Sequence, residues 1–152
     1  MKKIKYPLIS LIIIIIDQIT KYYINNNYIL NEENSIINNF FYITNAHNNG
    51  AAFSILSGYN IFLLLFTIAT IYILYKNLEH NTSFYILLGG IIGNFIDRIF
   101  FGYVRDFLDF RIFNYNFPIF NIADICICLG IFLLIIKVVR SDLNDYKWRK
   151  CW

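Results

Sequence analysis

Residues 84–101 read FYILLGGIIGNFIDRIFF, an apolar run that carries Asp97 and Arg98 near its end. A helix that crosses the hydrocarbon core of a bilayer, which is about 30 Å thick, needs roughly 20 residues, so this run is long enough to span it. A charged side chain at a lipid-exposed bilayer centre costs about 2.5–3.5 kcal/mol. The run therefore predicts a membrane-spanning helix whose charged residues face other helices or water.

Three further apolar runs of similar length, residues 7–24, 59–75 and 120–139, predict three more spans. The composition agrees, because 58% of the 152 residues are apolar and only 15% are charged, far from the balance of a soluble domain. No small-x-small cleavage site follows the first run, which indicates an uncleaved span rather than a secretory signal. We predict one all-α membrane domain over residues 1–152, built as a four-transmembrane-helix bundle.

The basic residues are concentrated near the two ends of the chain. The loop 25–58 has none, whereas three precede the first run and four follow the last: Lys2, Lys3, Lys5, Arg140, Lys147, Arg149 and Lys150. Positive charge beside spans stays on the cytoplasmic side, so we expect both termini there. No basic patch indicates nucleic-acid binding. Alternating residues within the loop, such as 40–44, predict a small sheet at the outer surface of the membrane.

Polar residues three or four positions apart share one face of a helix. Three of the predicted helices carry such a pair: Asp17 and Lys21, Asn94 and Arg98, and Asn121 and Asp124. At about 1.5 Å per residue, Lys21, Arg98 and Asp124 each lie about 21–22 Å from the cytoplasmic end of their helix. Asp106 follows Gly102, which we expect to end the third helix and to allow a return to the same level. These positions predict one polar cluster in the outer leaflet.

Two interpretations of this cluster are open at this point. Interhelical hydrogen bonds, worth about 0.6 kcal/mol per contact in membranes, explain the residues of the first and third helices about as well as a functional site does. Two carboxylates at one depth favour a site, because simple helix association seldom requires a second unpaired acid. The small-xxx-small pattern in residues 89–93 needs no chemistry and indicates close helix packing.

The sequence lacks the motifs of other hydrolytic chemistry. It has no HExxH zinc motif and no GxSxG elbow. Cys126, Cys128 and Cys151 have no metal-binding spacing, so we expect no metal and no cofactor. Two close aspartates share a proton, so that the ionised one activates water while the protonated one polarises a carbonyl. The predicted chemistry is peptide hydrolysis without a covalent intermediate.

Five motifs extend from the first predicted span to the last. They are Asp17-x-x-Thr20-Lys21, Asn48-x-Gly50-Ala51-Ala52-Phe53, Gly89-Gly90-x-x-Gly93-Asn94-x-x-Asp97-Arg98, Val104-x-Asp106-Phe107-x-Asp109 and Phe117-Pro118-x-Phe120-Asn121-x-Ala123-Asp124. In this order they resemble the lipoprotein signal peptidase family, also called signal peptidase II. No single motif is decisive, but five in order argue against a chance match.

The resemblance implies an aspartic endopeptidase of the bacterial inner membrane, with its active site near the periplasmic face. Such an enzyme removes the signal peptide from prolipoproteins by cutting just before a cysteine that carries a diacylglyceryl group. The resemblance makes Asp106 and Asp124 catalytic, and assigns substrate-binding or supporting roles to Asn121, Arg98, Asn94, Asn48, Asp17 and Lys21. It also implies a short periplasmic helix over the site. The implied partners are lipidated signal peptides and membrane lipids, and we expect a monomer.

Arg105 departs from the family pattern, which more often has an apolar residue directly before the catalytic aspartate. Its charge could lower the pKa of the neighbouring Asp106 or contact a lipid phosphate, and we favour the phosphate contact. Asp109 lies beside the predicted site, and we expect it to shape the connection 102–119.

A small proton-coupled transporter or channel subunit is the alternative from another class, because ion pathways also use intramembrane acids. It predicts internal repeats or polar residues through both leaflets, whereas the second run is nearly free of charge and no repeat is evident. A factor that only assembles other membrane proteins would not need two acids at one level.

Overall fold

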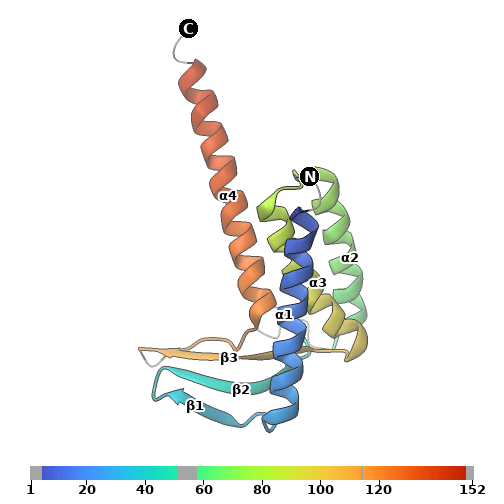
Figure 1. Cartoon of the computed structure of the whole chain (residues 1–152), viewed down its shortest axis with the longest axis vertical. Helices are drawn as coiled ribbons and strands as arrows, with labels where there is room; N and C mark the ends of the chain where they lie inside the picture. The colour runs from blue at the N-terminus through green and yellow to red at the C-terminus, as the bar shows by residue number, and fades with distance from the viewer. Residues whose placement is uncertain (1–4, 51–57, 114, 150–152) are drawn as a thin grey trace.

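The computed structural model describes residues 5–50, 58–113 and 115–149, and it shows four long helices with a small sheet at one end (Figure 1). The helices are α1 (Lys5–Asn27), α2 (Asn60–Asn77), α3 (Thr82–Phe100) and α4 (Ile122–Arg149). The strands are β1 (Glu33–Ile37), β2 (Phe41–Asn48), β3 (Val104–Ile112) and β4 (Tyr115–Asn116). The predicted helix bundle with a surface sheet is confirmed, and the short helix implied by the resemblance is absent from these described residues.

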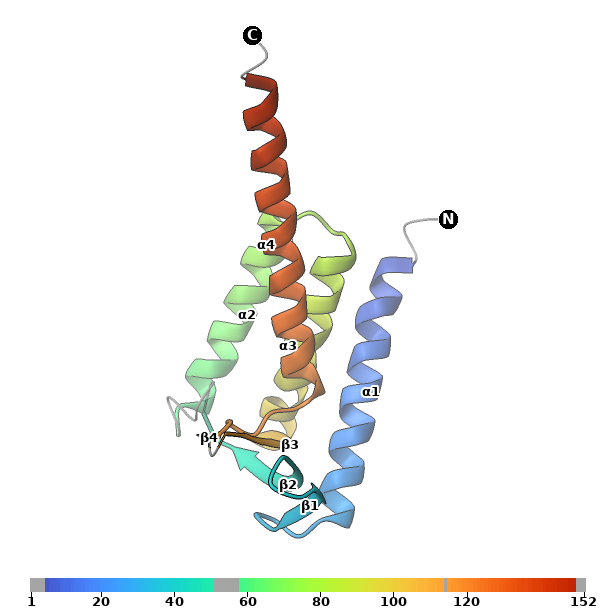
Figure 2. The same cartoon turned by 90° about the vertical axis from the view of Figure 1, so that its left-hand side faces the viewer.

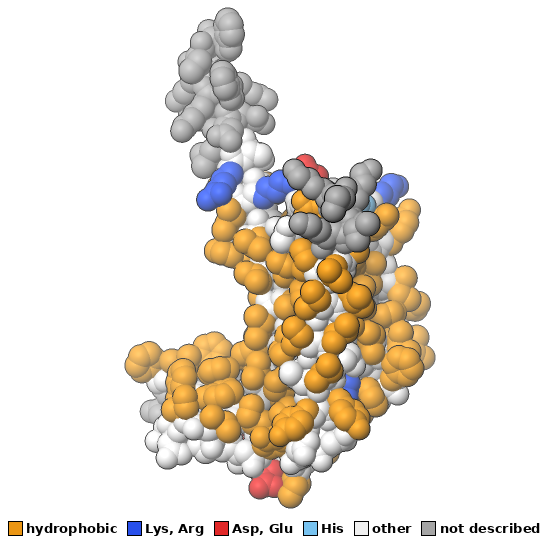
Figure 3. Space-filling view, in the orientation of Figure 1, with side chains coloured by type: hydrophobic (Ala, Val, Ile, Leu, Met, Phe, Trp, Pro, Cys, Tyr) orange, Lys and Arg blue, Asp and Glu red, His pale blue; other side chains and the backbone are white. Residues whose placement is uncertain are grey.

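Each helix contains a segment long and apolar enough to cross a membrane: Tyr6–Asn27, Asn60–Asn77, Thr82–Phe100 and Ile122–Ser141. Large apolar side chains cover the outside of the helices, and Ile61 and Leu65 of α2 are 75% and 61% exposed. Figure 3 shows this apolar cover around the helical part of the molecule. Lipid, rather than protein, therefore solvates most of the helix surface.

The bundle has two distinct ends. α1 begins and α4 ends at one of them, which we call the terminal end, and the sheet lies at the other, which we call the sheet end (Figures 1 and 2). α3 is the central helix, since it packs against α1 and α4 and, over a smaller contact, against α2. α2 consequently stands apart from α4 along much of its length (Figure 2).

Glycines let the neighbours of α3 approach closely. A Cβ on Gly90 would lie 2.4 Å from the carbonyl oxygen of Ala123 in α4. A Cβ on Gly93 would lie 2.7 Å from Oδ2 of Asp17 in α1. The small-xxx-small pattern in residues 89–93 therefore acts in helix packing, as predicted.

The sheet is antiparallel, with strand order β1-β2-β3-β4. Gly102, with a φ of +81°, turns the chain from α3 into β3 and so ends the third helix as expected. In the β2–β3 register Ala46 lies opposite Asp106 and Asn48 lies opposite Val104. Because side chains alternate between the two faces of a strand, Asn48 and Asp106 share one face.

Candidate active site

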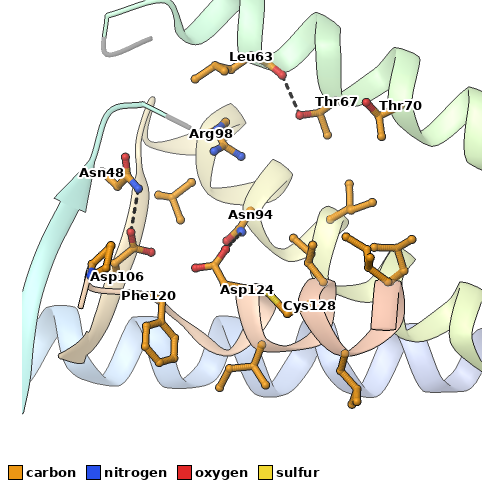
Figure 4. Close-up of a pocket in the computed structure, with 18 of the residues that line it drawn as sticks. Asn48, Leu63, Thr67, Thr70, Asn94, Arg98, Asp106, Phe120, Asp124 and Cys128 are labelled. Carbon is orange, nitrogen blue, oxygen red and sulfur yellow. Dashed lines mark hydrogen bonds between the residues drawn. The ribbon is translucent and has the colours of Figure 1, made fainter. Parts of the chain in front are cut away.

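Two aspartates from different elements line one cavity of about 1100 Å³. Asp106 comes from β3, and Asp124 comes from the first turn of α4. Both carboxylates point into the cavity in Figure 4, where Asn48, Asn94 and Arg98 surround them. The fold thus brings together two acids that lie eighteen positions apart in the sequence.

Amide groups hold the Asp106 carboxylate on both sides. Asn121 Nδ2 donates to Oδ1 at 2.6 Å, and Asn48 Nδ2 donates to Oδ2 at 3.0 Å. The Asn48 amide is itself fixed, because its Oδ1 accepts a hydrogen bond from the Gly50 N–H at 3.0 Å. The rest of that motif, residues 51–53, lies outside the described residues.

The Asp124 carboxylate is set by the start of α4. Asn121 is the residue before the helix, and its Oδ1 accepts from the Asp124 N–H at 3.0 Å, while Asp124 Oδ2 accepts from the Asn121 N–H at 3.1 Å. This reciprocal pair is a capping box, which fixes both side chains at a helix N-terminus. Asn94 Nδ2 of α3 completes the arrangement by donating to Asp124 Oδ1 at 2.7 Å. Asn121 therefore contacts both acids.

Burial and the neighbouring acid act together on Asp106, which is 4% exposed. Desolvation, followed by the charge of Asp124, raises the pKa of Asp106 from 3.8 to about 7, against the opposing effect of the hydrogen bonds from Asn48 and Asn121. Asp106 is consequently about half protonated near pH 7, where an ordinary aspartate is ionised.

A second cluster of charges lies beside this pair, between α1, α3 and β3. Lys21, which is fully buried, places its Nζ 2.8 Å from Asp17 Oδ2, 2.9 Å from Asn94 Oδ1 and 3.6 Å from Asp97 Oδ2. Asp17 Oδ1 also accepts from the Ala123 N–H at 2.9 Å, which ties α1 to the start of α4. We call the set Asp17, Lys21, Asp97 and Arg105 the balanced network, because it holds two acids and two cations.

Arg105 belongs to this network, and the expected contact with a lipid phosphate is wrong. Its side chain is only 6% exposed and places Nη2 2.7 Å from Asp97 Oδ1 and 3.0 Å from Gln18 Oε1. The guanidinium also lies over the ring of Phe101, 4.4 Å from its centroid. Arg105 points to the opposite side of β3 from Asp106, because neighbouring strand residues face opposite ways.

Asn94 connects the balanced network to the two catalytic candidates. Its Oδ1 accepts from Lys21 and from Asn121 Nδ2 at 3.1 Å, so its NH₂ group is left to face Asp124. Lys21 thereby decides which way the Asn94 amide points. This buried lysine reaches the site through a neutral side chain rather than through direct contact.

Arg98 lines the same cavity near the pair. Its Nη2 donates to the carbonyl oxygen of Gly50 at 3.2 Å, and its own carbonyl oxygen accepts from Asn60 Nδ2 of α2. Within the described residues no ion pair joins Arg98 to Asp106 or Asp124. Arg98 thus offers a positive charge beside the pair without neutralising it.

All eight site residues expected from the sequence lie at the sheet end. Seven of them belong to the pair or the balanced network or bond to one of them, and Arg98 lines the same cavity. Sequence reasoning left Gln18 out of the site, and it did not pair Asp97 with Arg105. Gln18 Nε2 donates to Asp97 Oδ1 at 3.0 Å. One feature of the sequence indicates that Gln18 belongs to the site, because Gln18 directly follows the predicted site residue Asp17. Asp109 accepts from Thr44 Oγ1 at 3.1 Å, so it joins β2 to β3 as its expected shaping role requires.

The cavity continues away from the pair as an apolar groove between α2, α3 and α4. Its walls carry mainly apolar side chains, among them Leu63, Phe66, Leu87, Ile91, Ile127, Leu129 and Phe132. The charged and amide side chains of the lining gather at the sheet end, around Asp106 and Asp124, while Thr67 and Thr70 of α2 line the groove farther from the pair. Within the described residues no group of three His, Cys, Asp or Glu could hold a metal ion. An apolar groove that ends at two aspartates inside a bundle of membrane-spanning helices is the arrangement of a membrane aspartic peptidase.

The family follows from comparison with known proteins. Residues 9–140 match the model of the family described as signal peptidase (SPase) II. The lipoprotein signal peptidase of Halalkalibacterium halodurans is 39% identical over 150 residues, which cover 93% of this chain and 96% of that protein. That of Staphylococcus aureus (strain JH9) is 41% identical over 145 residues, covering 90% and 89%. The chain belongs to the signal peptidase II family.

Solved structures agree with this assignment. A bacterial membrane enzyme determined by the in meso method at 2.3 Å resolution superposes with a TM-score of 0.84 at 38% identity, covering 92% of this chain and 90% of that one. A second, at 1.9 Å resolution, gives a TM-score of 0.78 at 39% identity, with coverages of 88% and 92%. The protein is thus a multi-pass bacterial membrane enzyme that cleaves the signal peptides of prolipoproteins.

Proposed function

We propose that Asp106 and Asp124 are the catalytic pair that cleaves a prolipoprotein just before its diacylglyceryl-modified cysteine. The observation that carries this proposal is that the two carboxylates face one cavity and are held by neutral donors alone, the Asn48, Asn94 and Asn121 amides and one backbone N–H. Because no cation neutralises them within the described residues, the two acids cannot both ionise cheaply. They therefore share a proton, which is the state that hydrolysis requires.

Each acid then has a separate task. Asp106, whose pKa is raised to about 7, carries the proton and donates it toward the carbonyl oxygen of the scissile bond. Ionised Asp124 takes a proton from water, and the water oxygen attacks the carbonyl carbon. The proton on Asp124 passes to the amide nitrogen as the C–N bond breaks. The carbonyl group re-forms at the same time and returns a hydroxyl proton to Asp106, so that both acids regain their starting states. Asn94 and Asn121 hold the carboxylates in place through these steps.

The groove fits the apolar part of a signal peptide. Its walls are mainly apolar from the terminal end up to the pair, because the hydroxyls of Thr67 and Thr70 bond to carbonyl oxygens of their own helix. A helix lying in the groove would present its outer end to Asp106 and Asp124. The acyl chains of a lipidated cysteine at that level would enter the outer leaflet. The transporter alternative needs polar groups along the whole path, whereas here the charged lining residues lie at the sheet end.

The orientation and the oligomeric state complete the proposal. Lys76, Lys137 and Arg140 lie toward the terminal end, and Figure 3 shows basic side chains gathered there. Positive charge on the cytoplasmic side places both termini in the cytoplasm, and the sheet and the catalytic pair at the outer face of the inner membrane. All groups of the site come from one chain, which supports a single domain that works as a monomer.

Cleavage of a synthetic lipidated precursor by purified variants tests the proposal. Asp106→Asn and Asp124→Asn should each lower kcat by more than about a thousandfold, because both steps of proton transfer depend on the pair. Asp109→Asn, which changes a buried acid of the same strand, is the matched control and should retain partial activity. Near-normal turnover by either the Asp106 or the Asp124 variant would refute the assignment.

A precursor without the diacylglyceryl group should be cleaved poorly, and equal cleavage of the two precursors would refute the lipid requirement.

A further inference from the structure

An ion pair lies at the opposite end of the molecule from the catalytic pair. Glu79, in the connection between α2 and α3, pairs with Lys137 of α4. The side chains are 77% and 47% exposed, so neither is committed to the core of the bundle. Exposed pairs of this kind contribute little to stability, which leaves Glu79 free to exchange one cationic partner for another.

The two residues stand where the walls of the groove end. Leu74 of α2 lines the groove five residues before Glu79, and Phe132 of α4 lines it five residues before Lys137. A helix that enters the groove from the terminal end would therefore pass this ion pair.

Glu79 has a distinct electrostatic position. The structure describes side chains as far as Ser141, and among these Glu79 is the acid at the terminal end, while Lys76, Lys137 and Arg140 are cationic. Figure 3 shows acidic and basic side chains close together there. Among the side chains described at this end, a cationic segment would be attracted by Glu79 and repelled by Lys76, Lys137 and Arg140.

The length of the groove matches the layout of a signal peptide. Thirteen residues of α4 separate Asp124 from Lys137, which correspond to about 20 Å at 1.5 Å per residue. A signal peptide has a positively charged segment followed by an apolar segment of about 7–15 residues before its cleavage site. With the scissile bond at Asp124, the apolar segment fills the groove and the charged segment reaches Glu79.

We propose that Glu79 is the binding subsite for the cationic N-terminal segment of the signal peptide, and that Lys137 occupies Glu79 until that segment displaces it. The inference rests on the proposed function, because it places the signal peptide in the groove. It makes Glu79 and Lys137 determinants of substrate affinity at a distance from the chemistry. Lys137 acts as a competitor, so the two residues of one ion pair have opposite effects on binding.

Steady-state kinetics of the full chain in detergent test this competition. With a lipidated precursor bearing two lysines near its N-terminus, Glu79→Gln should raise KM about two- to fivefold, the range of an exposed ion pair. Lys137→Gln should lower KM by a similar factor, because it removes the competitor. Both substitutions should leave kcat unaltered, and their effects on KM should become smaller at high salt. Glu32→Gln, which removes an exposed acid at the sheet end, is the control and should change nothing.

The same peptide with its lysines replaced by glutamines shows whether the ion pair acts in substrate binding or only in the structure of the protein. The proposal requires that Glu79→Gln and Lys137→Gln have no effect on its KM. If the ion pair only stabilises the packing of the α2–α3 connection against α4, both variants should change KM in the same direction and for both peptides. That result would overturn the proposal. Loss of activity in the Asp106 and Asp124 variants is independent of this result, so failure here would leave the catalytic assignment intact.

Discussion

Two pairs of aspartates lie side by side in this molecule, and they differ in what compensates their charge. Asp17 and Asp97 face two cations, Lys21 and Arg105, at 2.7–3.6 Å, and all four side chains are almost completely buried. The cations satisfy the oxygens of both acids and join α1, α3 and β3. A balanced network of this kind is stable because each charge is paired, and it has no acid available for chemistry.

Among the described residues, the groups that donate hydrogen bonds to Asp106 and Asp124 are neutral. Their oxygens accept hydrogen bonds from the side chains of Asn48, Asn94 and Asn121 and from one backbone N–H. Amides fix the direction of a carboxylate but supply no net charge, so the repulsion between the two acids persists. The comparison shows that the partner of a buried acid, more than its burial, decides whether it stabilises the fold or keeps a mobile proton.

Removing a cation from the balanced network should have the largest effect on stability. Lys21→Met keeps the length of the side chain but leaves Asp17 and Asp97 buried with one cation between them. Breaking a buried pair costs about 3–5 kcal/mol, so we expect a clearly lower Tm in detergent. Asp106→Asn, which neutralises an acid of the catalytic pair, should by contrast keep or raise the Tm.

A second, compensating substitution separates the contribution of the Lys21 charge to the Tm from the contribution of its packing. In the double variant Asp17→Asn with Lys21→Met the network again has equal numbers of acids and cations, so much of the lost Tm should return. If Lys21→Met alone melted like the unmodified protein, the network would not stabilise the bundle. Without recovery in the double variant, the packing of Lys21 rather than its charge would be responsible.

Asn121 tests whether the neutral partners position the catalytic pair. Asn121→Ala removes the amide that donates to Asp106 and the cap of α4. Misplacement of a catalytic group by about 1 Å can cost a hundredfold, so we expect kcat to fall about 10- to 100-fold. The lost cap should also destabilise the protein by about 1 kcal/mol.

Asn121→Ser distinguishes these two roles. Serine restores an oxygen that caps the helix but has no amide to reach Asp106, so the Tm should recover while kcat stays low. Recovery of kcat together with the Tm would show that Asn121 serves α4 alone.

The pH dependence of cleavage reports the shared proton directly. Asp106 has a raised pKa of about 7, so it is protonated below this value and ionised above it. Because the proposed mechanism needs this proton, kcat/KM should fall by about tenfold per pH unit above about 7. Since the acids are coupled, the observed value belongs to the pair. A rate that stays constant from pH 7 to pH 9 would contradict the assignment of Asp106 as the proton donor.

Much of the fold and of the site could be predicted from the sequence. Apolar runs of membrane-spanning length predict the helices. The spacing of Asp17 and Lys21 along one helix face predicts their contact, which the structure shows at 2.8 Å. The Asn-x-x-Asp spacing of Asn121 and Asp124, at the start of an apolar run, contains the capping box. These features are local, so periodicity and depth suffice to predict them.

The partner of Arg105 could not be predicted in this way. Residues 102–119 looked like an outer connection, where an arginine would reach lipid phosphate. Part of this connection instead forms β3. Residues 104–107 of that strand are buried on both faces, because the helices cover one face and the other forms a wall of the cavity. A strand buried on both faces lacks the alternation of apolar and polar residues that would reveal it.

Arg105→Val should therefore have the smallest effect on catalysis, and it sharpens the comparison between the two pairs. Asp97 keeps Lys21, Gln18 and the N–H of residue 105 as partners, so the loss amounts to charge-assisted hydrogen bonds, worth about 1.5–3 kcal/mol. The Tm should fall less than in Lys21→Met. The pH–rate profile should stay unchanged, because Arg105 lies on the opposite side of β3 from Asp106. A shift of the alkaline limb in this variant would show that the balanced network also tunes the catalytic pair, and that the two pairs of aspartates act as one electrostatic unit.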